Sequence, residues 1–243
     1  MVSLINEKSQ LDFLPADPFA ARITALFETY GASQSFAFFW VQTVEGVPTA
    51  AICRVDGSAT LFCAENADYE ELSAFLSAVG FSDVTCCADC AERLGLPIKK
   101  TSFIVRYRGN EAELPAADIL SDYDKKELYA LLTECGFELG DYGSFLADVC
   151  ARLAKGTASL AAVESGGELS ACAFALFEGE KSVLLGAVAT RPAARGRGYA
   201  SALVGSLAKE KSEKAVFLFC RNDSLADFYK KIGFEICGRW AVC

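Results

Sequence analysis

The chain of 243 residues contains no histidine, one methionine and two tryptophans. The absence of histidine removes the commonest general base and the commonest metal ligand in proteins. No run of 18 apolar residues occurs, so the sequence predicts no membrane-spanning helix. A basic segment followed by an apolar run and a cleavage site is also absent, so we expect no secretory signal peptide. Hydrophobic residues make up 52% and charged residues 23%, which is typical of a globular chain.

Basic residues are too few to balance the acidic ones, and the net charge is −9. Residues 1–120 hold 8 lysines and arginines against 16 aspartates and glutamates, a net charge of −8; residues 121–243 hold 15 against 16, or −1. Because an acidic chain is a poor non-specific binder of nucleic acid, we expect no nucleic-acid partner. The acidic first part favours a cationic or amine-bearing acceptor, although solubility alone is the simpler explanation.

The 11 cysteines are an odd and high number for a cytosolic chain. Several lie inside apolar, strand-like runs: Cys53, Cys63, Cys172 and Cys220. Free cysteine is among the most buried residue types, so we interpret most of them as small core residues in a reducing, cytoplasmic compartment. The group Cys86-Cys87-x-x-Cys90 lacks the histidine or second CxxC that would complete four zinc ligands, so we expect buried or surface thiols rather than a metal there.

Hydrophobic periodicity predicts two successive sets of helices and strands. The first set has helices over 18–30, 69–79 and 88–94 and strands over 35–42, 47–55, 59–64, 82–86 and 102–107. The second has helices over 124–135, 144–154, 222–231 and from 200 onward, and strands over 158–164, 169–178, 183–189, 215–220 and 234–241. Residues 1–17 form a polar lead-in, and the polar segment 108–121 is the best linker candidate. Ser121 and Asp122 are the candidate caps of the helix that follows it.

The two sets share one order of elements, which indicates an internal repeat. We therefore expect two domains, over 1–110 and 111–243, with an unrelated N-terminal α+β domain as the alternative. The halves differ at the start of the helix that follows the third strand. In the first half this position reads Ala64-Glu65-Asn66-Ala67-Asp68, whose two carboxylates would repel a phosphate.

The stretch from Ser182 to Lys211 is the most informative part of the second half. An apolar strand is followed by Arg195-Gly196-Arg197-Gly198-Tyr199-Ala200 and then by a helix with one apolar face. Glycines allow a ligand to approach the backbone closely, and a helix begins with free N–H groups and a positive dipole end. The arginines add fixed positive charge. The segment therefore predicts a phosphate-binding turn.

The spacing excludes two common phosphate-binding patterns, since neither GxxxxGK[ST] nor GxGxxG is present. The pattern Arg195-x-x-Gly198-x-Ala200, preceded by Val188-x-Thr190-x-Pro192, instead resembles the acetyl-CoA-binding segment of the GNAT acetyltransferases. The alternative is a basic, glycine-rich turn that caps a helix. The resemblance implies an α+β fold, with a mixed, mostly antiparallel sheet flanked by helices. It also implies a tandem GNAT arrangement whose N-terminal half is degenerate.

A second segment carries the same resemblance. The residues from Asn222 to Phe234, with Ala226, Tyr229 and Gly233 in register, are similar to the family pattern N-x-x-A-x-x-F/L-Y-x-x-x-G-F. The resemblance implies that Tyr229 lies near the CoA sulfur and that Asn222 contacts the pantetheine arm. A phenol with a pKa of about 10 can protonate a departing thiolate with a pKa of about 8.5. A core tyrosine is the alternative interpretation of Tyr229.

The resemblance further implies an oxyanion contact from a backbone amide in the strand Gly186–Ala189, which we assign to Val188. Tyr229 is then the catalytic residue, and no metal is expected. The implied acetyl-CoA-binding residues are Ala187, Val188, Ala189, Arg195, Gly196, Arg197, Gly198, Tyr199, Ala200 and Asn222.

The general base is not identified by the sequence. Without histidine, the candidates are glutamates at strand ends, Glu164 and Glu178, or ordered water. Each glutamate is more simply explained as a solvated surface acid. The resemblance implies that acetyl-CoA lies across a V-shaped gap between the strands Val183–Ala189 and Ala215–Cys220. Cys220 ends the second of these strands, but nothing near it in the sequence would activate it as a nucleophile, so we expect it in the core.

The sequence as a whole predicts a cytoplasmic N-acetyltransferase that moves an acetyl group directly from acetyl-CoA, its co-substrate, to an amine acceptor. The acceptor would be a small-molecule or peptide amine, with no membrane partner, and homo-oligomerisation stays open. Two alternatives stay open as well. One is a non-catalytic CoA-sensing or interaction module with the same fold, and the other is an enzyme for a different acyl-CoA.

Overall fold

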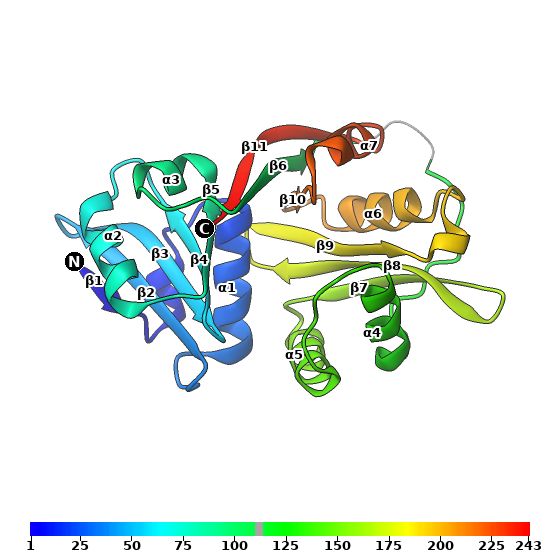
Figure 1. Cartoon of the computed structure of the whole chain (residues 1–243), viewed down its shortest axis with the longest axis horizontal. Coiled ribbons are helices and arrows are strands. Elements are labelled where there is room, and N and C mark those ends of the chain that lie inside the picture. Colours follow the sequence, from blue (N-terminus) through cyan, green and yellow to red (C-terminus); the bar gives the residue numbers. More distant parts are fainter. Residues whose placement is uncertain (110–113) are drawn as a thin grey trace.

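A computed structural model describes residues 1–109 and 114–243 of the chain. Over these residues the backbone forms one 11-stranded sheet in the order β1-β2-β3-β4-β5-β11-β6-β10-β9-β8-β7 (Figure 1). The strands are β1 (Val2–Leu4), β2 (Ala37–Val44), β3 (Val47–Val55), β4 (Ser58–Cys63), β5 (Asp83–Cys87), β6 (Lys100–Tyr107), β7 (Ser159–Ser165), β8 (Glu168–Glu178), β9 (Ser182–Thr190), β10 (Ala215–Phe219) and β11 (Phe234–Val242). The helices are α1 (Pro18–Tyr30), α2 (Tyr69–Val79), α3 (Ala88–Arg93), α4 (Lys125–Glu134), α5 (Tyr142–Lys155), α6 (Tyr199–Glu210) and α7 (Ala226–Lys230).

Each half of the sheet repeats one motif. Three antiparallel strands are followed by a helix and a strand that runs parallel to the third: β2-β3-β4 with α2 and β5, and β7-β8-β9 with α6 and β10. The fold is thus a mixed, mostly antiparallel sheet flanked by helices. The predicted duplicated α+β fold is confirmed.

The two halves exchange their last strands. Strand β6, from the first half, pairs with β10 and β11 of the second half, and β11 pairs with β5 and β6 of the first. In Figure 1 these two long strands form the bridge between the two lobes. Because a strand is stabilised by its neighbours on both edges, neither half has a complete sheet without the other. The domain boundary near residue 110 remains a prediction, and it lies at the residues outside the described part.

Helix α1 of the first half packs against both halves. Phe19 contacts Phe219 of β10 with ring centroids 5.2 Å apart, and it shares a buried apolar cluster with Leu184 of β9 and Trp240 of β11. In the second half, α6 and α7 cover one face of the sheet, and α4 and α5 cover the other (Figure 1). Among the residues that the structure describes, no helix has the length and apolar character needed to cross a bilayer.

Two local predictions differ from the structure. Asp124 caps α4 by accepting hydrogen bonds from the N–H groups of Lys126 and Glu127, at 2.9 and 3.0 Å, so the prediction of Ser121 or Asp122 as the cap is wrong. Asp122 forms an ion pair with Lys125 instead. The helix expected over 222–231 is shorter, because a 3₁₀ turn at Asp223–Leu225 precedes α7.

Parts of the predicted lead-in (1–17) and of the predicted linker (108–121) form regular secondary structure or pack against the sheet and helices. Residues Val2–Leu4 form edge strand β1, and Lys8–Leu11 form a 3₁₀ turn. After the undescribed residues, Leu114 packs against α6, and Leu120 forms an isolated antiparallel bridge with Ala162 of β7. These short pieces depend on partners distant in sequence, which a local pattern does not contain.

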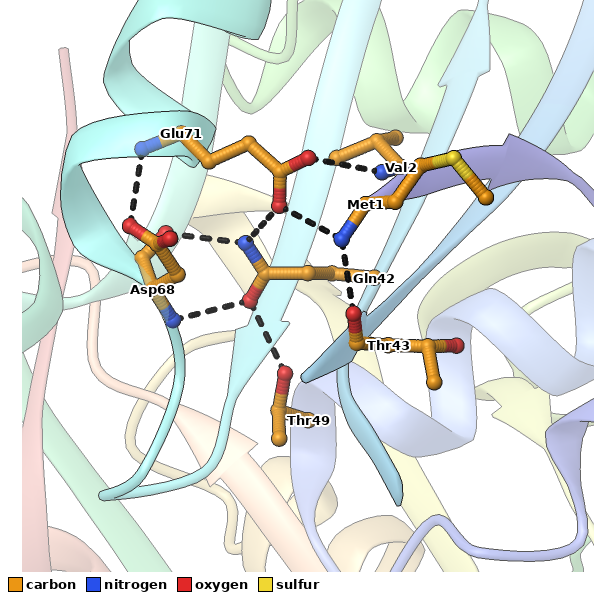
Figure 2. Close-up of polar contacts among 7 residues, drawn as sticks. All are labelled: Met1, Val2, Gln42, Thr43, Thr49, Asp68 and Glu71. Atoms are coloured by element: carbon orange, nitrogen blue, oxygen red, sulfur yellow. Dashed lines mark hydrogen bonds and ion pairs between the residues drawn. The ribbon is translucent and has the colours of Figure 1, made fainter. Parts of the chain in front are cut away.

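A polar network closes the start of α2 in the first half (Figure 2). The buried Gln42 amide donates to the Asp68 carbonyl at 2.9 Å and to Glu71 Oε2 at 2.8 Å. Gln42 Oε1 accepts from the Asp68 N–H at 3.0 Å and from Thr49 Oγ1 at 2.9 Å. Asp68 Oδ1 in turn accepts from the Glu71 N–H at 3.0 Å. The helix start is therefore occupied by the protein's own groups.

We expect Gln42→Leu to destabilise the fold by about 2 kcal/mol, because it leaves buried donors and acceptors unpaired. For a chain of this size the loss corresponds to a decrease in Tm of roughly 4 to 8 °C in thermal unfolding. Gln34→Leu is the control, since Gln34 is exposed. Equal Tm values for the two variants would contradict the importance of this network.

Candidate functional site

Strands β9 and β10 separate where the cofactor was expected. They pair in parallel from Ser182↔Ala215 to Leu185↔Leu218, and no pairing continues beyond that point. On the other edge of β9, Gly186 pairs with Phe174 and Ala189 pairs with Cys172. Ala187 and Val188 therefore oppose a single residue of β8, which is a β-bulge.

The bulge has a backbone conformation that is unusual for its residues. Ala187 has φ +48°, a left-handed value that non-glycine residues adopt rarely and at a cost in energy. A Cβ on Gly186 would lie 2.4 Å from Leu176 Cδ1, so a larger residue there would require the Leu176 side chain to move. Backbone strain of this kind is often found at functional sites, where it directs a backbone group toward a ligand.

A cavity of about 390 Å³, which we call the gap cavity, lies where the two strands separate. Gly186, Ala187 and Val188 of β9 line it together with Leu218 and Phe219 of β10. Tyr229 of α7, Leu225, Arg221, Lys100 and the segment Gly136-Phe137-Glu138 complete the wall. The fold thus brings the predicted Tyr229 to the predicted strand segment.

Tyr229 is 5% exposed and packs between Phe228 and Phe234, with ring centroids 5.1 and 5.9 Å away. No hydrogen bond to its hydroxyl is found among the described residues, although the side chain lines the gap cavity. Burial, with a smaller contribution from the Cys220 sulfur, raises the pKa of Tyr229 above its usual value. The phenol is therefore protonated at neutral pH and could donate a hydrogen bond or a proton into the cavity.

The predicted phosphate turn has the geometry that such a turn requires. Gly196 and Gly198 have φ +77° and +82°, values that favour glycine. Gly198 is the N-cap of α6 and offers no side-chain oxygen, so the first N–H groups of the helix have no side-chain cap. A second cavity, of about 210 Å³, which we call the turn cavity, lies along this turn and is lined by Thr190, Ala194, Arg195, Gly196, Gly198, Tyr199, Ala200, Ser201 and Phe228.

The arginines of the turn are exposed. The Arg195 Nε donates to the Thr190 carbonyl at 3.2 Å, and Arg195 lines the turn cavity. Arg197 is exposed beside it and does not line the cavity. The turn also packs closely against the segment before α4. A Cβ on Gly198 would lie 2.9 Å from the Pro115 side chain, so a larger residue there would disturb this packing.

Besides Arg197, two predicted cofactor residues line neither cavity. Ala189 is 3% exposed and packs in the apolar cluster beneath α4 and α5. Asn222 is exposed, and its Oδ1 accepts a hydrogen bond from Ser224 Oγ at 2.6 Å. The structure thus brings Ala187, Val188 and Tyr229 together but leaves the side chains of Ala189 and Asn222 apart from them.

Neither glutamate considered as a base lines the gap cavity. Glu178 forms ion pairs with Lys211 at 3.0 Å and Lys214 at 3.4 Å, and Glu164 accepts a hydrogen bond from the Tyr123 hydroxyl at 3.0 Å. The acidic side chain that does line it is Glu138, in the connection between α4 and α5. The sequence gives no signal for Glu138, because the fold of that connection depends on packing against distant strands.

A third cavity, of about 410 Å³, lies between the two halves, and we call it the inter-half cavity. Its walls come from α1 and the β3–β4 turn of the first half and from α5 and β8 of the second. Glu138 and Ala187 line both this cavity and the gap cavity. A molecule in the inter-half cavity would therefore lie next to the bulge.

The corresponding helix start in the first half lacks these features. There Asp68 caps α2, and Gln42 and Glu71 fill the adjoining space (Figure 2). The two halves thus share a fold but differ in the turn that could receive a phosphate.

The cysteines include one close pair. The Sγ atoms of Cys90 and Cys63 lie 3.1 Å apart. Over residues 1–109 and 114–243, no group of three or more histidine, cysteine or acidic residues is arranged to hold a metal ion. Burial, together with the charge of Asp223, raises the pKa of the Cys220 thiol to about 11. Cys220 is thus a protonated, buried thiol that packs in the core.

Comparison with known proteins identifies the family of the second half. Residues 156–236 match the family model described as "Acetyltransferase (GNAT) domain". This range contains the bulge, the glycine–arginine turn, Asn222 and Tyr229. No curated protein sequence matches the chain.

Solved structures share the fold across nearly the whole chain. A GNAT-family acetyltransferase from Colwellia psychrerythraea has 14% identity and a TM-score of 0.57, covering 100% of this chain and 98% of its own. A tandem GNAT protein from the clavulanic acid biosynthesis pathway has 13% identity and a TM-score of 0.62, with 100% and 97% covered. A GCN5-related N-acetyltransferase from Sphaerobacter thermophilus has 15% identity and a TM-score of 0.58, with 100% and 94% covered.

At these identities the structural likeness concerns the fold, and the family assignment comes from the matched domain. The duplicated motif is consistent with the tandem protein among the similar structures. Residues 156–236 of this chain form a GNAT acetyltransferase domain, within a chain that has the GNAT fold in a tandem arrangement.

Proposed function

We propose that the chain transfers an acetyl group from acetyl-CoA to an amine, using the second half as the catalytic half and acting in the cytoplasm. One observation carries the proposal: the bulge of β9 and Tyr229 line the gap cavity, and the glycine–arginine turn at the start of α6 lines a second cavity together with Phe228, the neighbour of Tyr229. The turn would hold the pyrophosphate through the N–H groups and dipole of α6. The gap cavity would hold the thioester.

The bulge supports a role for the Val188 amide as oxyanion donor. The Ala187 carbonyl accepts a hydrogen bond from Cys172 Sγ at 3.6 Å, on the face covered by α4 and α5. In a trans peptide the carbonyl and the following N–H point in opposite directions. The Val188 N–H is therefore directed toward the opposite face, which carries Tyr229. A donor preset toward developing negative charge stabilises the transition state.

Tyr229 would protonate the departing CoA thiolate. Because burial raises the pKa of Tyr229, the hydroxyl carries its proton at neutral and mildly alkaline pH. The pKa of Tyr229 stays above that of a free thiol, about 8.5. The phenol would therefore first donate a hydrogen bond to the developing thiolate and then transfer its proton as the C–S bond breaks. Water would return the proton to the tyrosine.

Glu138 would accept the proton of the attacking amine, since it lines both the gap cavity and the inter-half cavity. We expect Glu138→Gln to lower kcat for acetyl transfer by roughly 100-fold, with acetyl-CoA affinity nearly unchanged. The measurement is initial-rate kinetics over a range of amine concentrations. Glu168→Gln is the control, because Glu168 is exposed in the β7–β8 hairpin and lines neither cavity. Equal loss in both variants would remove Glu138 from the mechanism.

The test of the proposed function is release of free CoA thiol from acetyl-CoA in the presence of a panel of amines, with mass spectrometry of the products. Amine-dependent thiol release and an acetylated amine are the expected result. Binding of acetyl-CoA without amine-dependent turnover would instead support a non-catalytic CoA-sensing module. A larger acyl group on the CoA would be tested in the same assay.

A further inference from the structure

The inter-half cavity is suited to a small molecule that reaches the bulge. Its volume of about 410 Å³ lies within the range of small-molecule sites. Aromatic and aliphatic side chains, including Phe145, Phe174 and Phe177, form much of its wall. Since Glu138 and Ala187 belong to both this cavity and the gap cavity, a bound amine would lie beside the thioester. This inference rests on the function proposed above.

Two arginines line this cavity and lie over the same aromatic ring. The guanidinium carbons of Arg22 and Arg152 are 5.2 and 5.1 Å from the centroid of Phe177. Arg22 comes from α1 of the first half and Arg152 from α5 of the second. Like charges brought this close repel one another unless negative charge lies between or beside them.

The two arginines differ in their partners. Arg152 donates from Nη1 to the Leu176 carbonyl at 3.0 Å and forms an ion pair with Asp148, which also accepts a hydrogen bond from the Tyr30 hydroxyl. The buried Nε atoms of both arginines lack a partner, but Arg22 also has no hydrogen bond or ion pair from its other nitrogens to any described residue. Burial lowers the pKa of the Arg22 guanidinium, but arginine remains charged near neutrality.

The acidic groups of the cavity do not balance Arg22. Asp148 is already paired with Arg152, and the other two lining acids, Asp56 and Glu138, are exposed at the mouth. The cavity therefore has an unneutralised positive charge inside and negative charge at its entrance. A largely buried guanidinium without a counter-ion has lost hydration, and an anion placed beside it would restore the balance.

We propose that the acceptor is an amine that also carries an acid group, bound with the acid group at Arg22 and the amine near Glu138. In the reaction the amine nitrogen attacks the thioester carbonyl carbon. A C–N bond forms, the C–S bond breaks, the amine proton passes to Glu138, and the CoA thiolate takes the proton of Tyr229. The overall acidity of the first half favours a cationic acceptor, whereas the charges inside this cavity favour the acid-bearing amine.

The test compares acid-bearing amines with matched neutral ones in the thiol-release assay. The panel contains α- and ω-amino acids, their amides, diamines, and phosphoethanolamine to distinguish a carboxylate from a phosphate. We expect wild type to prefer acid-bearing amines over their neutral counterparts by roughly 10- to 100-fold in kcat/KM. Arg22→Met should remove this preference by raising KM, with kcat and acetyl-CoA affinity close to wild type.

Two further variants separate charge from folding. Arg22→Lys keeps the charge and should retain part of the preference, even if the methionine variant is poorly folded. Arg54→Met is the matched control, because Arg54 also lies over an aromatic ring, that of Phe81 at 6.0 Å, but does not line the cavity.

The outcomes distinguish this inference from the proposed function. If wild type acetylates amides or diamines as well as the acids, or if Arg22→Met keeps the preference, the acid-bearing acceptor is wrong while acetyl transfer stands. Acetyl-CoA binding with turnover of neutral amines alone would also overturn the acid-bearing acceptor and leave acetyl transfer intact. Absence of both acetyl-CoA binding and turnover would instead contradict the proposed function itself.

Discussion

Replacing Tyr229 by phenylalanine should lower kcat about 100-fold or more while leaving acetyl-CoA affinity close to wild type. The substitution removes the hydroxyl, and the ring stays packed between Phe228 and Phe234. Without the phenol, the CoA thiolate must leave without a positioned proton donor. The loss should therefore fall on kcat and on kcat/KM equally, as expected for an interaction made in the transition state.

Tyr107→Phe is the matched control for this variant. Tyr107 packs against the same Phe234, at 5.2 Å between ring centroids, but does not line the gap cavity. We expect Tyr107→Phe to retain wild-type kcat. If Tyr229→Phe also retained it, the acid would have to be another group or water, and the catalytic role of Tyr229 would be wrong.

Reversing the two charges of the turn should abolish tight acetyl-CoA binding. In Arg195→Glu/Arg197→Glu, two carboxylates would replace two cations where the pyrophosphate is expected, and we expect a loss in affinity of roughly 100-fold or more. Both side chains are exposed, so the fold should be retained. Gly198 is less suitable for this purpose, because a Cβ there would clash with Pro115 and the fold itself would be disturbed.

A control with the same change in net charge is Lys126→Glu/Lys209→Glu. Both lysines are exposed and line neither the turn cavity nor the gap cavity. Acetyl-CoA affinity should remain within a few-fold of wild type in this control. Equal weakening in both double variants would mean that overall charge, rather than the turn, determines binding.

The sequence predicts what depends on local patterns. The strand Val183–Ala189, the glycine turn and the helix after it are contiguous, so the apolar periodicity and the positive-φ glycines reveal them directly. The bulge at Ala187 is less visible, because its left-handed φ falls on an alanine and not on a glycine.

The exchange of β6 and β11 could not be predicted in the same way. Each reads as an ordinary last strand of its half, and both the exchanged and the unexchanged pairing would bury the same alternating side chains. Only the long-range pairing of residues such as Ile104 with Phe219 reveals which half a strand completes.

The residues proposed for the acceptor illustrate the same limit. Arg22, Glu138 and Arg152 come from three separate elements, and in the sequence each looks like a charge on a solvated helix face or loop. Their significance depends on the two halves meeting around one cavity. The net charge of the first half, −8, gives no indication of a buried, unpaired arginine within it.

The most direct test of the central claim is the thermal unfolding of the purified chain with and without acetyl-CoA. At a concentration about 100 times Kd, the ligand should stabilise the fold by about 2.7 kcal/mol, which raises Tm by roughly 5 to 10 °C. The account predicts this increase for wild type and for Lys126→Glu/Lys209→Glu, and an increase of no more than about 1 to 2 °C for Arg195→Glu/Arg197→Glu at the same concentration. An unchanged Tm for wild type at millimolar acetyl-CoA would contradict the cofactor site and leave the turn as a basic helix cap.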